Sequence, residues 1–445
     1  MDFGRDVRRF IGREQRASES WADPATLELL PLIALKRQAA AAGLAVHQAS
    51  KRERSPRLIT YAWMLREIAR RTGEPDTLAK AASAAARAVR EITDDAEVLA
   101  AARLEQAAAA KLGADLFADP SALDAADDFL KASEAVANVG RGLAGRRLAL
   151  RAALDAGAAL AAADLDQAVQ AAAALDAAVD RLDAELHETG RGKVEAASLR
   201  CDRADFLIGF GGRLKDKNLL VQAEADLAQL TARLDPDYLP LSWARSEGLR
   251  GAALAAMGDL AGDPKSLTES VRVLAAAAEQ IDADHSPLDR ARISHGLALS
   301  LIALAEAIDD EDLSNHALAA FDQALAVLGS GRDLTLRAVT AHDRAACVAR
   351  RAERRGDAAA LDQAESAFRA ELAVRNAAID PVAWAVTQLA LNRIYVARAE
   401  LPGGTSPPDG AAVALTEALD VLTERGLKTL AEAAQDGLDR LKSLR

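Results

Sequence analysis

The sequence contains few aromatic residues, and their scarcity argues against a β-rich fold. Phe, Trp and Tyr make up 3% of the 445 residues, whereas hydrophobic residues as a whole make up 50%. Sheets are built mainly from β-branched and aromatic side chains, whereas alanine, which dominates most segments here, is the strongest helix former. Since no segment alternates convincingly between apolar and polar residues, we expect an all-α protein.

Cysteines and long apolar runs are also scarce. Cys201 and Cys347 lie far apart, and neither belongs to a CxxC pair, which argues against a disulfide framework and a zinc site and suits a reducing compartment. The N-terminus lacks the apolar core of a secretory signal. The longest apolar run, residues 296–308, is shorter than the roughly 20 residues that a membrane span needs. We therefore expect a buried helix there and a cytoplasmic protein.

Charge is distributed unevenly along the chain. The net charge is −12, but residues 1–71 contain 14 Lys and Arg against 8 Asp and Glu. That segment therefore carries +6 and leaves −18 for the remainder. A basic N-terminal segment attached to an acidic remainder is the main electrostatic feature of the chain, and basic segments of this kind can contact a partner.

A repeated helix pattern organises most of the chain. A small residue is followed four positions later by Phe or Leu and usually seven positions later by Ala. These anchors are Ala223, Ser270, Ala317, Ala364 and Ala411, each separated by 47 residues. Earlier anchors, at less regular intervals, are Ala81, Ala126 and Ala168. Pro240, Pro287 and Pro381 follow the same 47-residue frame and each opens a helix. One unit is therefore a pair of antiparallel helices.

This pattern resembles the tetratricopeptide repeat (TPR). The spacing A-x3-F-x2-A, as in Ala317-Phe321-Ala324, carries the resemblance, together with Leu391, Asn392 and Tyr395 in a partner helix. The resemblance covers about residues 30 to 440 and is closest to the longer-period bacterial variety. The period of 47 exceeds the usual 34, and most units lack the full Trp-Leu-Gly-Tyr set. It implies a right-handed α-solenoid of about eight helix pairs, with a HEAT-like array as the structural alternative.

The repeat frame divides the chain into four parts. We expect a basic amphipathic segment or cap over 1–29, irregular repeats over 30–217, regular 47-residue repeats over 218–426 and a capping helix over 427–445. A single helix pair cannot bury its apolar face, so neighbouring units must cover one another and the array must end in caps.

A solenoid of this kind presents a concave groove. The resemblance implies a scaffold that binds another protein or a peptide there. Because no HExxH pair or convergent catalytic group occurs, we expect no enzyme activity, cofactor or metal. No aromatic interleaving accompanies the basic residues, so nucleic acid and anionic membrane are not favoured partners. The sequence also permits a homo-oligomer as an alternative.

Candidate contact residues fall into two sets. Polar residues on the first helix of each unit are expected to line the groove: Arg250, His295, His342, Arg344, Asn392 and Arg393. An arginine there can hold a carboxylate with two hydrogen bonds. The basic N-terminal set comprises Arg5, Arg8, Arg9 and Arg13 on a predicted amphipathic helix, and Lys51, Arg52 and Arg54 in a predicted interhelical loop. Two alternative functions remain: a sensor of a small signal, and an adaptor that attaches to membrane or nucleic acid through the basic region.

The stretch GFGGRLKDKN, residues 209–218, has the glycines of a phosphate-binding loop. Such a loop follows a strand and carries a Lys-Ser or Lys-Thr pair, and both are missing here. In the repeat frame, Gly211 shares a column with Gly258, Ala305 and Ala352, which suits close helix packing. We therefore predict a helix end at GFGG and a turn at KDKN.

Overall fold

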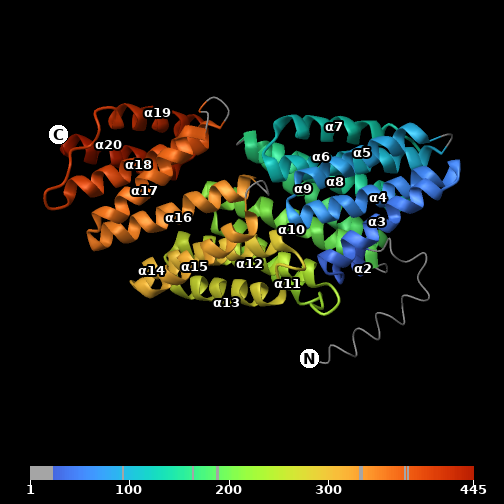
Figure 1. Ribbon diagram of the computed structural model, residues 1–445, viewed down its shortest axis with the longest axis horizontal. Coiled ribbons are helices and arrows are strands. Elements are labelled where there is room, and N and C mark those ends of the chain that lie inside the picture. The colour runs from blue at the N-terminus through green and yellow to red at the C-terminus, as the bar shows by residue number, and fades with distance from the viewer. Residues whose placement is uncertain are drawn as a thin grey trace.

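The chain folds into a stack of helix pairs. The computed structural model describes residues 24–444 except 93–94, 163–164, 187–189, 330–333, 375–376 and 378–379. None of these described residues forms a strand. Eight antiparallel pairs run from α4 to α19, with α2 and α3 at one end and α20 at the other (Figure 1). The predicted all-α, right-handed solenoid is confirmed.

The helices have the following bounds. The short first helix and the terminal helices are α2 (Pro24–Glu28), α3 (Leu32–Gln48) and α20 (Lys428–Ser443). The first helices of the pairs are α4 (Lys51–Thr72), α6 (Ala96–Phe117), α8 (Arg141–Ala162), α10 (Gly190–Leu214), α12 (Pro240–Ala261), α14 (Pro287–Ile308), α16 (Leu334–Arg355) and α18 (Pro381–Glu400). The second helices are α5 (Pro75–Glu91), α7 (Pro120–Glu134), α9 (Leu165–Leu186), α11 (Lys217–Thr231), α13 (Pro264–Gln280), α15 (Glu311–Leu328), α17 (Ala358–Val374) and α19 (Ala411–Glu424).

Helix starts are determined by short local signals. Pro240, Pro287 and Pro381 each occupy the first turn of a helix, as predicted. Asp263 and Asp310, one period apart, each accept a backbone hydrogen bond from the first turn of α13 and α15. These caps and prolines recur with the 47-residue repeat, so α12, α14 and α18, and likewise α13 and α15, begin at equivalent positions.

The first residues of the helices define the repeat length in each half of the chain. In the second half, α12, α14, α16 and α18 begin 47 residues apart, as predicted. In the first half, α4, α6 and α8 begin 45 residues apart, and so do α5, α7 and α9. Ala171 continues the 45-residue spacing of Ala81 and Ala126 into α9 and is buried, as is the predicted anchor Ala168. Irregularity is thus concentrated at the step from α8 and α9 to α10 and α11.

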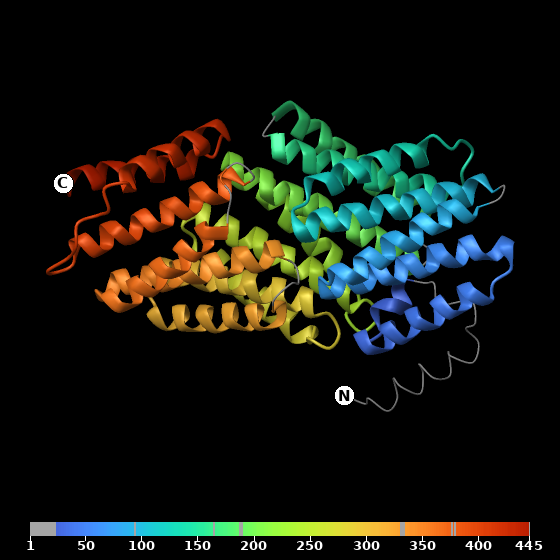
Figure 2. The ribbon, with the colours of Figure 1, turned by 45° about the horizontal axis from the view of Figure 1, so that its top comes forward.

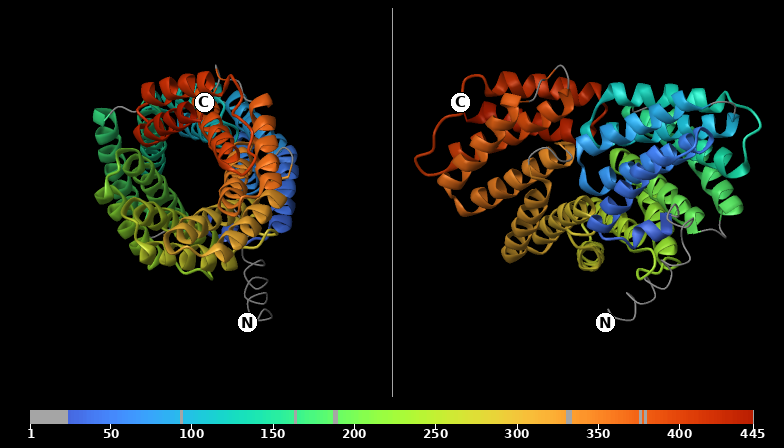
Figure 3. Two further views of the ribbon diagram at one scale, coloured as in Figure 1. Left: turned by 90° about the vertical axis from the view of Figure 1, so that its left-hand side faces the viewer. Right: turned by 45° about the vertical axis from the view of Figure 1, so that its right-hand side comes forward.

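Two layers of helices surround a common axis. Each first helix contacts the first helices of the adjacent units, whereas the second helices pack mainly against the first helices on either side. Figure 3 (left) shows the resulting ring of helices viewed along the long axis. The first helices form the inner layer and the second helices form the outer layer.

The solenoid returns to itself after five units. α4 contacts α14, α6 contacts α16, and α2 contacts α10 and α12 (Figure 2). Leu116 at the end of α6 belongs to one buried cluster with Leu288 of α14 and Leu328 of α15. The second superhelical turn therefore packs on the first and is not held only by its neighbours in sequence.

Helix α14 is the one described helix long and apolar enough, by length and composition, to cross a membrane. It packs against α12, α13, α15 and α4, and its buried residues include Ala291, Ala298 and Leu301. The predicted buried helix over 296–308 is part of α14, which lies where the second superhelical turn packs on the first.

The glycine-rich stretch is the end of α10. A Cβ on Gly211 would lie 3.1 Å from side-chain atoms of Leu219 and Leu220, so the two helices approach closely there. Lys215 has a positive φ of 56°, and Asp216 then caps α11. The predicted helix end is confirmed, although the second half of KDKN already belongs to α11.

The C-terminal helix α20 covers the last unit. Leu438 and Leu441 are buried against α18 and α19, with Leu430 and Leu444 partly buried beside them. These are the four leucines whose spacing predicts an amphipathic capping helix.

Candidate ligand groove

Four consecutive inner helices line one open cavity of about 300 Å³. Its walls come from α4, α6, α8 and α10, with Leu182 contributed by α9. These helices belong to the first superhelical turn. The cavity therefore occupies the concave face of the first half of the array.

The floor of this groove is apolar. Its side chains are Ile59, Trp63, Ala101, Leu104, Ala108, Leu112, Ala149, Leu150, Ala153, Leu182 and Leu199. The alanines leave space between neighbouring inner helices, whereas Trp63 offers a large face with an N–H group. A ligand with apolar side chains can bury them here.

Most charged side chains of the groove are paired. Arg66 makes two hydrogen bonds to Glu105, from Nε at 2.6 Å and from Nη2 at 3.2 Å. Lys111 lies 2.8 Å from Asp115 on the same helix. Arg146 of α8 lies 3.9 Å from Glu195 of α10. The first and third pairs connect neighbouring units, and all three contribute to the polar walls.

Arg70 and Asp202 differ from those pairs. Arg70 donates a long hydrogen bond of 3.5 Å to Ser198 Oγ and has no carboxylate within 4.0 Å among the described residues. The nearby Arg245 guanidinium, together with burial, lowers the pKa of Arg70. Asp202 is accessible from the groove but surrounded by helices, and this burial raises its pKa. The charges of Arg70 and Asp202 are therefore both accessible from the groove, and neither is neutralised by a close ion pair.

Behind Arg70, a buried network joins the two superhelical turns. Arg245 of α12 binds Asp289 of α14, with Nη2 2.7 Å from Oδ2, and lies 3.8 Å from Glu67 of α4. Burial alone would raise the pKa of Asp289, but Arg245 holds it well below its ordinary value. The groove thus borders the contact between first and second turns.

Helix α2 completes this network. Fully buried Arg71 donates hydrogen bonds to the carbonyl oxygens of Leu27 and Leu30, and Glu28 accepts hydrogen bonds from Ser242. Burial raises the pKa of Glu28 despite those bonds. Residues just before the first full helix therefore hold α4 against α12.

Two predicted groove arginines face the outer layer instead. Arg250 of α12 pairs with Glu224 of α11 at 2.9 Å and lies 4.0 Å from Glu269 of α13. Arg344, two periods later, pairs with Asp322 of α15. Neither lines the groove of α4 to α10, because the column that they share points toward the gaps between outer helices.

Asn392 and Arg393 are also separated from that groove. Asn392 is buried against Gly437 of α20, where it packs between two helices. Arg393 pairs with Glu353 of the neighbouring inner helix α16, with Nε 2.8 Å from Oε2. Whether either residue contacts a ligand stays a prediction.

The two histidines of the shared column have equivalent surroundings. His295 packs on Phe321 with ring centroids 5.7 Å apart, and His342 packs on Phe368 at 5.0 Å. His295 Nε2 lies 3.5 Å from Asp343, and His342 Nδ1 lies 3.0 Å from Glu371. Burial lowers the pKa of His295 to about 4, so it is neutral at pH 7. These contacts give the column a packing role between units.

Replacing Asp343 with asparagine is expected to stabilise the protein at high pH. Burial raises the pKa of Asp343 to about 6, above its unfolded value near 3.9, so the free energy of unfolding falls as the pH rises from about 4 to 6 and stays lowered above that. Asparagine removes this cost, and we expect the free energy of unfolding at pH 8 to rise by about 1–2 kcal/mol. At pH 4, where Asp343 is largely protonated in the folded state, the gain should vanish. Urea titrations of both proteins at pH 8 and pH 4 measure this, and equal gains at both values would contradict it.

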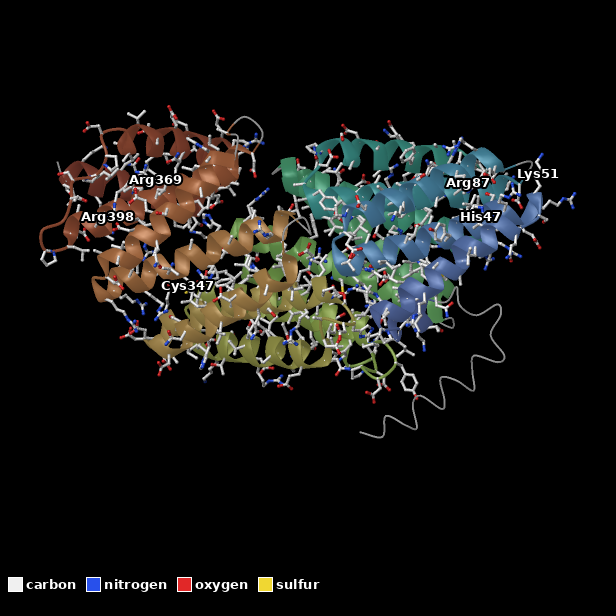
Figure 4. The ribbon with its side chains drawn as sticks, viewed as in Figure 1. His47, Lys51, Arg87, Cys347, Arg369 and Arg398 are labelled. Carbon is white, nitrogen blue, oxygen red and sulfur yellow. The ribbon has the colours of Figure 1, made fainter. Side chains whose placement is uncertain are left out.

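The basic N-terminal set lies only partly within the described residues. Arg5, Arg8, Arg9 and Arg13 fall outside them. Lys51, Arg52 and Arg54 do not lie in a loop as predicted, because KRERSPR forms the first turns of α4. Arg54 donates to the Ala49 carbonyl oxygen at the end of α3 and lies 3.7 Å from Glu91. Lys51 and Arg52 are exposed at the end of the array where Figure 4 labels His47 and Lys51.

Within the described part of the chain, no group of three or more His, Cys, Asp and Glu side chains is placed to hold a metal ion. Cys201 and Cys347 are unpaired, and burial raises the pKa of the Cys201 thiol to about 11. That thiol is therefore unsuited to act as a nucleophile at neutral pH.

Sequence reasoning missed the groove because it concentrated on the regular second half. Most of the residues that line the cavity belong to the 45-residue units, and the others lie on α10 at the irregular step, where the repeat signal is weak. A usable signal was present: small residues and charges alternate at helical spacing, as in Ala101, Glu105, Ala108 and Lys111 of α6.

Comparison with known proteins supports the architecture. A Rap protein complexed with competence and sporulation factor superposes with a TM-score of 0.50 at 13% identity, covering 88% of this chain and 97% of that chain. The apo form of RapI gives a TM-score of 0.46 at 12% identity and covers 87% and 97%. A circular tandem repeat protein gives 0.26 at 15% identity and covers 92% and 88%. No family model and no curated protein matches the sequence. At such identities the likeness shows the fold alone, and the predicted TPR-type helical repeat is confirmed.

Proposed function

We propose that this TPR-like solenoid is a non-catalytic scaffold of the cytoplasm that binds a segment of another protein, or a peptide, in the groove of α4, α6, α8 and α10. The observation that carries this proposal is the continuous cavity along four consecutive inner helices, with an apolar floor between polar walls. Extended concave surfaces are how repeat proteins bind their partners.

Two further observations support the proposal. The Rap protein of similar fold was crystallised with competence and sporulation factor bound, so a solenoid of this kind can hold a second molecule. The unpaired thiols of Cys201 and Cys347 suit a reducing compartment. Co-purification from lysate identifies the partner.

A substitution that fills the groove is expected to abolish partner binding. Ala108 lies on the floor, and tryptophan at this position would occupy much of the 300 Å³ cavity. We expect Ala108→Trp to lose at least tenfold in affinity, an energy of about 1.4 kcal/mol, for the partner recovered from lysate. Binding is measured by co-purification followed by titration of the recovered partner.

The matched control is Ala82→Trp, because Ala82 is exposed on the outer helix α5. It should bind like the wild type. Loss of the partner in both variants, or in neither, would count against the groove. Loss only on deletion of residues 1–57 would favour an adaptor that uses its basic region instead.

A sensor of a small signal is the second candidate. A cavity of about 300 Å³ lies at the lower end of the range for small-molecule sites. A thermal-shift screen against metabolites tests this function, since any ligand that prefers the folded state raises the melting temperature. A complete lack of stabilisation would count against it.

A further inference from the structure

Arg70 is the groove guanidinium that lacks a carboxylate partner among the described residues. The other two arginines of the cavity, Arg66 and Arg146, each pair with a glutamate of a neighbouring helix. Arg70 has only the 3.5 Å hydrogen bond to Ser198 Oγ. Because Ser198 accepts that bond, its hydroxyl hydrogen remains available to a ligand.

The empty groove leaves Arg70 in an unfavourable position. Arg245 lies behind it and already uses its own charge on Asp289 and Glu67. The repulsion between these guanidinium groups and the burial of Arg70 lower its pKa, although the more distant Glu67, Asp289 and Asp202 act in the opposite direction. An anion bound to Arg70 from the groove side would offset this repulsion, whereas a neutral ligand would leave it unchanged.

We propose that Arg70 binds a singly charged carboxylate of the groove's ligand, with the Ser198 hydroxyl donating a second hydrogen bond to it. This inference rests on the proposed function, because it names the chemistry that the groove recognises. A guanidinium presents parallel N–H donors that match the two oxygens of a carboxylate.

The charges that line the groove disfavour a ligand with more than one negative charge. Four basic side chains line it, namely Arg66, Arg70, Lys111 and Arg146. Four acidic side chains face them, namely Glu105, Asp115, Glu195 and Asp202. A dianion such as a phosphate monoester would be repelled by Asp202 and its neighbours, whereas a carboxylate adds one charge opposite one unpaired cation.

The apolar floor defines the rest of the ligand. Trp63, Leu104 and Leu199 border the cavity together with several alanines. The ligand therefore carries its carboxylate on an apolar body. Two sources share this chemistry: a polypeptide with a carboxylate next to apolar residues, and a free organic acid.

The test uses defined probes on the full chain. Hexapeptide pools with random apolar residues at the last three positions are prepared with a free carboxylate or with an amide at the C-terminus. Octanoate serves as the free-acid probe. Peptides retained by the wild-type protein are then titrated against wild type, Arg70→Gln, Arg70→Lys and the control Arg37→Gln, whose arginine is exposed on α3.

We expect the wild type to prefer the free carboxylate over the amide by at least roughly tenfold in Kd, the effect of losing a charge-assisted hydrogen bond. Arg70→Gln should lose this preference, Arg70→Lys should retain part of it, and Arg37→Gln should behave like the wild type. Binding of octanoate without peptides identifies a free acid as the ligand, and binding of peptides alone identifies a polypeptide.

Melting temperature separates binding from a structural role. Because Arg70 is repelled and weakly bonded, Arg70→Gln should melt at or above the wild-type temperature, whereas Arg66→Gln, which breaks the pair with Glu105, should melt lower. An equal preference for carboxylate in wild type and Arg70→Gln overturns this inference and leaves groove binding intact. A drop in melting temperature of Arg70→Gln as large as that of Arg66→Gln also overturns it. Failure of every probe and every lysate protein to bind the wild type contradicts the proposed function, and this inference with it.

Discussion

Replacing Arg71 with methionine is expected to lower the free energy of unfolding by about 3–5 kcal/mol, because it leaves a buried carboxylate without its main partner. Arg71 is fully buried and holds three groups: Glu67 through Nε at 2.9 Å, and the carbonyl oxygens of Leu27 and Leu30. Burial alone would raise the pKa of Glu67, but Arg71 and Arg245 hold it below its ordinary value. Methionine fills the space but donates no hydrogen bond.

The loss should appear first at the joint between the two superhelical turns. Arg71 connects α4 to α2, and α2 contacts α10 and α12. Hydrogen exchange should therefore accelerate in residues 24–30 and at the start of α12 before it does in the outer helices. Urea unfolding measures the total effect.

Arg37→Met is the control for this experiment, since Arg37 is exposed on α3, and surface substitutions usually change stability by less than about 0.5 kcal/mol. The double variant Arg71→Met with Glu67→Leu should recover part of the loss, because a buried pair replaced by apolar residues costs less than a broken pair. An unfolding midpoint for Arg71→Met equal to that of Arg37→Met would show that α2 does not fasten the turns.

The sequence predicts this architecture well because a solenoid depends on local signals. The 47-residue spacing of Pro240, Pro287 and Pro381 marks the helix starts that the structure contains. The anchors Ala317 and Phe321 are buried, as their spacing requires. Each signal concerns a residue and its neighbours within one or two units, and nearest-neighbour contacts determine the stack.

Contacts between superhelical turns could not be predicted from the sequence in this way. They arise because small rotations between units add up over five repeats, and no sequence pattern shows that sum. Arg71, Glu28 and Asp289 therefore read as ordinary charged residues of helices, although they meet at one buried joint. The predicted contact residues Arg250 and Arg344 lie away from the cavity of α4 to α10 for a related reason. The 3.6-residue period shows that they share a face, but it does not show whether that face points to the axis or to the outer layer.

A charged segment with a proline can also mislead. KRERSPR reads as a loop, yet it begins α4, with Ser50 before the helix and Pro56 in its second turn. Buried Ser55 donates a hydrogen bond to the Ala88 carbonyl oxygen of α5, and Arg54 and Arg57 bond to the last carbonyl groups of α3. Lys, Arg and Glu favour a helix, and packing against two neighbouring helices stabilises this one despite Pro56.

Truncating the two equivalent phenylalanines is expected to give equal local losses with different consequences for the groove. Phe321 and Phe368 lie 47 residues apart, are both fully buried, and each packs on a histidine of the preceding inner helix. Replacing either with alanine should cost about 3–5 kcal/mol in its own unit. Because solenoid stability is a sum over units and interfaces, the weakened unit and those beyond it can unfold separately.

The difference lies in what each unit supports. Phe321 belongs to the pair α14 and α15, and α14 packs against α4, which lines the groove. Phe368 lies in α17, whose partner helix α16 contacts α6 but not α4 among the groove helices. We therefore expect Phe321→Ala to speed hydrogen exchange in α4 and α6 and to weaken ligand binding. Phe368→Ala should speed exchange in α6 and in α16 to α20, spare α4 and weaken binding less. The same exchange pattern in both variants would mean that the array unfolds as one cooperative body, because only then would the position of the weakened unit along the superhelix have no effect.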